Sequence, residues 1–264
     1  MSKKIESYAP GSFCWAELAT SDVESARNFY GEMFGWTVLE YPTPDGPYLI
    51  FQAEGDHAAA ARPAGPSMPP HWGVYFSTAD ADVSAGRVAP LGGKVVEGPF
   101  DVMEAGRMAV VQDPAGVFFS LWQPGRHIGA TYGGLVNRVC WAELVTPDPA
   151  RVVAFYAGLL GWKTKPETGI DAAEYIEWLN DGKPFAGMLP MRGEIWKGVP
   201  PHWMIYVSVA DCDERVARAR QLGAAVYVPP RDIPNVGRFS VIADAQGAAI
   251  SLLALTAMQA PAAA

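Results

Sequence analysis

The chain has 264 residues, of which 50% are apolar and 18% are charged, and its formal net charge is −8. This composition is typical of a compact globular protein, and the length allows two domains of ordinary size. The acidic balance argues against nucleic acid or an anionic membrane as a partner, because phosphate groups are bound by basic surfaces. No apolar run reaches the ~20 residues of a membrane span. The first residues lack the apolar core of a signal peptide, so we expect a cytoplasmic protein.

The first predicted element is a strand over residues 12–19. Alternation along it places Trp15 and Glu17 on one face and Cys14, with its apolar neighbours, on the other. A helix should follow, because Ser21 and Glu24 have the spacing of a capping box. The helix should end at residue 35, a glycine. Three further strands are predicted over residues 37–41, 48–53 and 58–62.

The same order of elements then begins again. A strand is predicted over residues 71–78, a helix from residue 80 or 82 to about residue 91, and strands over 94–97, 107–112 and 117–123. Arg107 opens one of these strands, and we expect it to form a salt bridge at the rim. Each half of this segment is therefore a βαβββ module, and a sheet with a helix on one face must bury or use its other face.

The whole pattern recurs in the second half of the chain. Residues 14–18 return at 140–144, and residues 69–72 return at 200–203. We predict an α+β protein with domains at 10–128 and 136–256, each a pair of modules forming a cupped half-barrel. Whether modules pair within one copy or across copies stays open. A tandem duplication replaces a homodimer by a covalent pseudo-dimer, so we expect a monomer, with a homodimer as the alternative.

Several short motifs of the repeat resemble those of the vicinal oxygen chelate superfamily, which includes glyoxalase I, extradiol dioxygenases and the fosfomycin and bleomycin resistance proteins. They are Asp22 before Phe29-Tyr30 and Gly35-Trp36, then Leu91-Gly92-Gly93, then Asp113-Pro114-x-Gly116. Within the superfamily the chain is most similar to tandem glyoxalase-like proteins of actinobacteria that are often labelled hydroxylases. The resemblance implies the fold, but the fold hosts isomerases, oxygenases, transferases and pure binding proteins.

The resemblance also implies a divalent metal, held by histidine and glutamate at four positions in a domain. Those positions carry Trp15, the alanine run 58–61, Gly73 and Ser120 in the first copy. In the second copy they carry Trp141, residues 185–187, Met204 and Ser251. Indole and alkyl groups cannot coordinate a metal, and a serine hydroxyl is a poor ligand alone. We therefore expect no cofactor at the usual site, while a divalent metal at a shifted site stays open.

Two glutamates and two histidines lie near these positions. Glu17 and Glu143 are two residues from the first position, and His71 and His202 are two residues before the third. Each pair could transfer protons or hold a shifted metal. Alternatively, Glu17 is held by a backbone amide or an arginine, and His71 caps a strand after two prolines. A buried carboxylate needs a partner or a proton in any of these cases.

Aromatic side chains are expected on the same faces. Alternation directs Trp15, Tyr75, Trp141 and Tyr206 into the predicted cups, beside Ser120 and Ser251. They could bind a flat ligand or simply fill the core. The sequence thus predicts a small-molecule binding protein. A lyase, isomerase or oxygenase acting on a small oxygenated substrate is the alternative, so whether the chain is an enzyme stays open.

Overall fold

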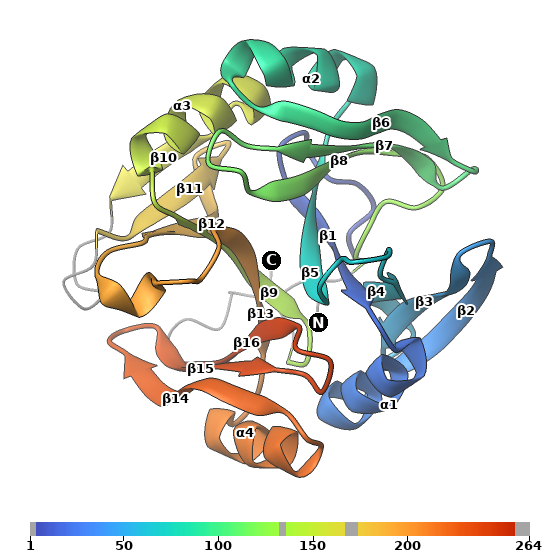
Figure 1. Cartoon of the computed structure of the whole chain (residues 1–264), viewed down its shortest axis with the longest axis vertical. Helices are drawn as coiled ribbons and strands as arrows, with labels where there is room; N and C mark the ends of the chain where they lie inside the picture. The colour runs from blue at the N-terminus through green and yellow to red at the C-terminus, as the bar shows by residue number, and fades with distance from the viewer. Residues whose placement is uncertain (1–3, 132–135, 167–173, 257–264) are drawn as a thin grey trace.

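The structure is a computed structural model that describes residues 4–131, 136–166 and 174–256. In this part of the chain it holds two eight-stranded sheets, one in each repeat (Figure 1). The first sheet has the order β2-β3-β4-β1-β5-β8-β7-β6, and the second has the order β10-β11-β12-β9-β13-β16-β15-β14. This architecture confirms the predicted α+β fold of two tandem domains.

The elements of the first domain are β1 (Phe13–Thr20), α1 (Val23–Phe34), β2 (Thr37–Thr43), β3 (Gly46–Ala53), β4 (Asp56–Pro63), β5 (His71–Ser77), α2 (Ala81–Val88), the 3-10 turn η1 (Ala89–Leu91), β6 (Lys94–Val102), β7 (Gly106–Gln112) and β8 (Phe118–Pro124). Those of the second domain are β9 (Val139–Thr146), α3 (Pro149–Leu160), β10 (Lys163–Pro166), β11 (Ile176–Asn180), β12 (Lys183–Pro190), η2 (Glu194–Trp196), β13 (His202–Ser208), α4 (Cys212–Gln221), β14 (Ala225–Ile233), β15 (Gly237–Ala243) and β16 (Ala249–Leu255).

The two modules of each copy pair with one another, which answers the question that the sequence left open. β1 is antiparallel to β5, and β9 is antiparallel to β13, so the first strands of the two modules meet at the centre of each sheet. Each sheet curves so that its modules flank a concave face, which is turned away from the other domain (Figure 1). The helices lie on the opposite, convex side.

The helix caps differ in one respect from the sequence prediction. In α1 the N-cap is Asp22, whose side chain accepts a hydrogen bond from the Ser25 amide, so the predicted capping box of Ser21 and Glu24 is wrong. The aspartate is one residue closer to the helix and takes the capping position itself. Gly35 ends α1 in the left-handed region, at φ 69°, as expected.

The strand alternation of β1 is interrupted near its start. Phe13 pairs with Phe76 while Trp15 pairs with Tyr75, so the register shifts between them. This bulge places Cys14 in the same cluster as Trp15 and corrects the prediction that they lie on opposite faces. Ala16, beyond the bulge, packs on the convex side as expected.

One hydrophobic core runs through both domains. The sheets lie back to back with β5 against β13, and α1 and α2 lie beside α4 and α3 of the other domain (Figure 1). A buried relay crosses between the domains: the Trp72 indole donates to the Tyr30 hydroxyl at 3.1 Å, and Tyr30 donates to Asp244 at 2.9 Å.

The repeat provides a second relay in the opposite direction. Trp203 donates to Tyr156 at 3.1 Å, and Tyr156 donates to Asp113 at 3.2 Å. Tyr30 and Asp113, two of the motif residues that carry the family resemblance, therefore take part in hydrogen bonds between the two domains. Two further tryptophans also cross the boundary: Trp36 donates to the carbonyl oxygen of Asn137, and Trp162 donates to that of Gly11.

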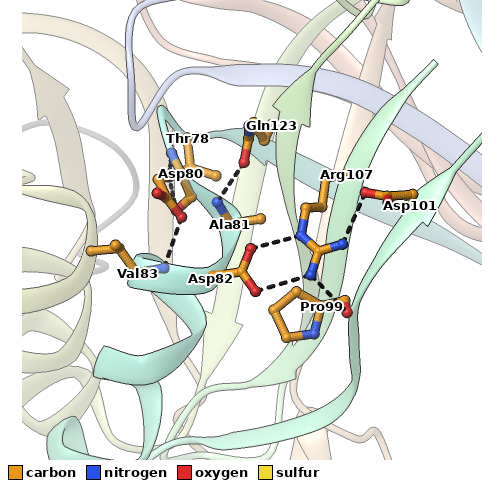
Figure 2. A network of polar contacts seen from close by, with 9 residues as sticks. All are labelled: Thr78, Asp80, Ala81, Asp82, Val83, Pro99, Asp101, Arg107 and Gln123. Atoms are coloured by element: carbon orange, nitrogen blue, oxygen red, sulfur yellow. Dashed lines mark hydrogen bonds and ion pairs between the residues drawn. The ribbon is translucent and has the colours of Figure 1, made fainter. Parts of the chain in front are cut away.

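The predicted salt bridge of Arg107 is confirmed. Its guanidinium donates two hydrogen bonds to Asp82 on α2 and one to Asp101 on β6 (Figure 2). Arg238 makes the equivalent contacts with Asp213 and Asp232. Both arginines tie a helix to a hairpin at the surface, outside the cups. None of the helices in the described residues has the length and apolar character needed to cross a membrane.

Candidate functional site

The concave face of each sheet carries its own small cluster of buried side chains. The first cup is formed by Cys14, Trp15, Ile50, Ala60, Tyr75 and Trp122. The second cup is formed by Met204, Tyr206, Phe239 and Leu253, with Trp141 packed against them. We use these two names below.

The structure places the predicted ligand-binding residues together. Tyr75 is paired with Trp15 on β1 and with Ser120 on β8, and Tyr206 is paired with Trp141 on β9 and with Ser251 on β16. Each cup therefore has a row of tryptophan, tyrosine and serine across three adjacent strands. Their role in binding stays a prediction.

Glu17 lies beside this row in the first cup and is almost completely buried. Its carboxylate accepts hydrogen bonds from the hydroxyls of Tyr48 and Tyr75, both at 2.9 Å, and from Nε of Arg62 at 2.7 Å. Two neutral donors and one cation therefore compensate for the loss of water around this charge. This is the alternative in which an arginine holds the glutamate.

Glu143 has the same place in the second cup, but its surroundings differ. Tyr206 donates to it at 2.9 Å, and Tyr175 also hydrogen-bonds its carboxylate. The Trp141 indole donates in turn to the Tyr175 hydroxyl at 3.0 Å. Burial raises the pKa of Glu143 to about 6, although the two tyrosines act in the opposite direction.

The second cup lacks the cation that the first cup places beside its glutamate. Arg62 pairs with Ala19 two residues after the Glu17–Ala60 pair, and Leu189 pairs with Val145 two residues after the Glu143–Gly187 pair. Leucine thus stands where the first cup has arginine. Among the described residues, Tyr206 and Tyr175 are the groups that act on the Glu143 carboxylate, and no arginine or lysine is among them.

Gly187 makes room for the second cup's hydrogen bonds. It is paired with Glu143 across β12 and β9. A Cβ added at this glycine would lie 1.8 Å from the Tyr175 hydroxyl oxygen and 3.0 Å from the Trp141 indole nitrogen. A glycine is therefore required for Tyr175 to lie over the strand and reach the carboxylate.

The two predicted catalytic histidines lie at strand ends. Nδ1 of His71 is 2.9 Å from the carbonyl oxygen of Pro69, and Nδ1 of His202 is 2.8 Å from that of Pro200. The hydrogen bonds among described residues join neither histidine to Glu17 or Glu143. Their role in proton transfer stays a prediction, and no contact with the glutamates supports it.

Chain segments outside the sheet cover the first cup. The His127 ring lies edge-on to Trp15 with ring centroids 4.6 Å apart, and burial lowers the pKa of His127 to about 4. Tyr8 donates to the carbonyl oxygen of Ala130, whose amide donates to the carbonyl oxygen of Cys14. A cavity of about 180 Å³ lies next to this cover, between the domains, where Tyr8, Trp15 and Ala130 face Val139 and Cys140.

Trp15 is consequently buried, whereas Trp141 is partly exposed. The chain beyond residue 256, which follows the second cup in sequence as residues 126–131 follow the first, lies outside the described residues. A larger hollow of about 410 Å³ lies away from both cups, between α1 and the second domain.

Sequence reasoning named neither Tyr48 nor Tyr175, and it gave an arginine as a possible partner of Glu17 without identifying Arg62. Tyr48 and Tyr175 occupy equivalent places in the repeat, so the duplication itself was a signal for them. Arg62 has no equivalent and gave no such signal. His57 and His127 occur in one copy each, and both rings approach Trp15.

The residues of the cups do not fit the metal that the fold family implies. Glu17 is flanked by Ala60 and Gly73 on the neighbouring strands, and its carboxylate already accepts three hydrogen bonds. Among the described residues, no group of three or more histidine, cysteine, aspartate or glutamate side chains is close enough to hold a metal ion.

Comparison with known proteins gives the same family in both halves. The sequence model of the glyoxalase/bleomycin resistance protein/dioxygenase superfamily matches residues 12–121, and that of a glyoxalase-like domain matches residues 139–253. CFP32 of Mycobacterium tuberculosis, provisionally named a glyoxylase, is 38% identical over 261 residues, which cover 96% of this chain and 98% of that one. DnrV of Streptomyces peucetius, named an anthracycline biosynthesis protein, is 37% identical over 264 residues, with 94% of each chain covered.

Solved structures agree in fold. The Mn(II)-bound glyoxalase of Novosphingobium aromaticivorans matches with a TM-score of 0.64 at 16% identity, covering 93% of this chain and 82% of that one. The 2,3-dioxygenase LapB of Pseudomonas sp. KL28 matches with a TM-score of 0.63 at 14% identity, covering 94% and 93%. The chain therefore belongs to the glyoxalase/bleomycin resistance protein/dioxygenase superfamily, as a tandem of two such domains.

Proposed function

We propose that this protein binds a small, flat organic molecule in the second cup, with Glu143 as the polar contact. The observation that carries the proposal is a buried carboxylate among aromatic side chains without a cation of its own. Such a charge is costly unless hydrogen-bond donors surround it. Two tyrosines supply part of that need, and a ligand with a further donor would supply the rest.

The names of related proteins support an aromatic ligand. DnrV is named for anthracycline biosynthesis, and structural neighbours include a homoprotocatechuate 2,3-dioxygenase and a trihydroxybiphenyl dioxygenase. Trp141, which is partly exposed, and Tyr206 beside it offer ring surfaces against which a flat molecule can stack. The first cup has similar rings, but Tyr8, His127 and Ala130 cover them.

Titration with a panel of planar, oxygenated natural products tests the proposal. Because Trp141 is partly exposed at the site, binding should change tryptophan fluorescence, and Trp141→Phe should remove most of that change. Saturated compounds of similar size and oxygen content serve as controls. No response to any member of the panel, by fluorescence or calorimetry, would overturn the proposal.

A second candidate function is enzymatic proton transfer on a small oxygenated substrate. It is favoured by the pKa of Glu143, which burial raises to about 6, because a catalytic acid or base works best near the ambient pH. Mass spectrometry of each bound compound after incubation separates the two functions. Recovery of every ligand unchanged favours binding, whereas turnover that Glu143→Gln abolishes favours the enzyme.

A further inference from the structure

We propose that the second cup selects ligands that carry a protonated amine, and that this amine takes the position that the Arg62 guanidinium holds in the first cup. The inference rests on the proposed function, because it names the class of ligand for the same site. In the first cup the protein supplies its own cation, so that cup binds no ligand of this class.

The first step is the near-identity of the two carboxylate sites. Glu17 and Glu143 lie at equivalent positions of β1 and β9, and each is hydrogen-bonded by two tyrosines from equivalent positions. The duplication therefore shows the same carboxylate and tyrosine pair twice, with a different residue at the position of the cation. That change, Arg62 to Leu189, removes the cation and keeps the carboxylate.

The second step is the way in which the cation reaches the carboxylate. The Arg62 side chain is 39% exposed, whereas its partner Glu17 is 9% exposed. The positive charge thus approaches a buried acceptor from the solvent side. Leu189 has a shorter and uncharged side chain, so no guanidinium fills that direction in the second cup.

The third step is the charge around Glu143. Tyr206 and Tyr175 are neutral donors, since burial raises the pKa of both well above 10. Glu177, one strand further, forms an ion pair with Lys165 at 3.3 Å. On the other half of the sheet the exposed Arg231 lies over the Phe239 ring at 4.9 Å.

These surroundings favour a cation over an anion or a neutral ligand. An anion would be repelled by Glu143, and a neutral ligand would leave its charge uncompensated. An ammonium group can make a charge-assisted hydrogen bond with the carboxylate and contact the faces of Trp141 and Tyr206. The net charge of −8 also raises the concentration of cations near the protein.

Binding of an ammonium group has a proton signature. At pH 6 the Glu143 carboxyl, with a pKa of about 6, is about half protonated in the free protein. A bound cation stabilises the carboxylate, so binding at this pH should release roughly half a proton. The affinity should therefore rise between pH 5 and pH 7. A neutral hydrogen-bond donor has a weaker effect of the same sign, and an anion has the opposite one.

The experiment compares three probes on one bicyclic frame: 1-naphthylmethylamine, 1-naphthalenemethanol and 1-naphthoate. Calorimetry at pH 7 should show that the amine binds wild-type protein at least tenfold more tightly than the alcohol. Glu143→Gln and Leu189→Arg should each remove this preference. Glu104→Gln, which removes an exposed carboxylate of the first domain, should retain it.

Each other outcome has a defined meaning. Equal binding of the three probes, or an amine preference that persists in Glu143→Gln, overturns the inference and leaves the proposed function standing. Failure of the amine to bind at all also overturns it, and the planar panel then decides separately whether the second cup binds any ligand. Where Leu189→Arg does not fold, the nearly isosteric Glu143→Gln carries the test.

Discussion

The two cups are an internal experiment on one buried carboxylate. Glu17 and Glu143 have the same strand position and the same pair of tyrosine donors, but only Glu17 has an arginine. The cup with the arginine is covered by the chain, and the cup with leucine has a partly exposed tryptophan. The comparison teaches that one ion pair within the protein can neutralise the carboxylate of one cup, while the equivalent carboxylate in the duplicated domain keeps its charge without a cation.

The largest effect is expected from removing the arginine. Arg62→Leu makes the first cup like the second and leaves Glu17 buried without its cation. Removing one partner of a fully buried ion pair costs about 3 to 5 kcal/mol, and because Arg62 is partly exposed the cost here should lie near the lower end, at about 3 kcal/mol. Urea unfolding at pH 7 should show a loss of that order, and Glu17→Gln in the same protein should recover most of it. Unchanged stability of Arg62→Leu would contradict the comparison.

A somewhat smaller effect concerns pH. The folded-state pKa of Glu143 is about 6 against an ordinary value of 4.5, so the folded protein binds the proton more tightly than the unfolded chain. The contribution of this group is most favourable below pH 4.5 and is lost as pH rises through 6. The loss amounts to about 2 kcal/mol at pH 7.

Unfolding of wild type and Glu143→Gln at pH 5 and pH 7 measures this contribution. Only the difference between the two proteins counts, because other carboxylates titrate in the same range. Wild type should gain more stability at pH 5, relative to pH 7, than the glutamine variant does. Identical pH dependence would show that Glu143 is compensated by a group the structure does not place there.

Gly187→Ala should cost about 1 to 2 kcal/mol, because its Cβ would displace the Tyr175 hydroxyl. Loss of that hydrogen bond should also raise the pKa of Glu143, which NMR titration of the carboxyl can follow. The matched change in the first cup is the reverse, Ala60→Gly, which removes a buried methyl group and leaves the hydrogen bonds of Tyr48 and Tyr75 to Glu17 in place. If Gly187→Ala left the pKa of Glu143 unchanged, Tyr175 would not be a hydrogen-bond donor to this carboxylate.

The smallest effects are expected where the two domains agree. Arg107→Lys and Arg238→Lys each lose the two-pronged contact to an exposed aspartate, and each should lower the melting temperature only slightly. The two variants should also behave alike, since their ion pairs are equivalent. A clear difference in their melting temperatures would mean that the domains differ in more than their cups.

Much of this fold follows from local patterns that the repeat shows twice. Strand alternation placed Trp15, Tyr75 and Tyr206 correctly on the concave faces. The alternation was wrong for Cys14, because a bulge interrupts it there and the residue types do not reveal the bulge. Pairing of modules within a copy could not be predicted, since either pairing buries the same residues.

The identity of the arginine that pairs with Glu17 could not be predicted from the sequence, for another reason. Arg62 lies 45 residues from Glu17 in the chain, and the parallel register of β4 on β1 brings them together. Alternation fixes the face of a side chain but not its register on the next strand. The two copies differ because Glu143 is buried without a cation. This difference can be recognised only once the strand registers show that Arg62 and Leu189 occupy equivalent positions.

The paired Trp–Tyr–Asp relays have a consequence for how such a protein can change. Each relay starts in one half and ends on a turn of the other, so loss of the tyrosine in one half removes a hydrogen bond from a buried aspartate in the other. Each domain therefore constrains the residues of the other at the boundary between them. The relays place no such constraint on the concave faces. Divergence after duplication is thereby directed outward, to the surfaces that meet other molecules.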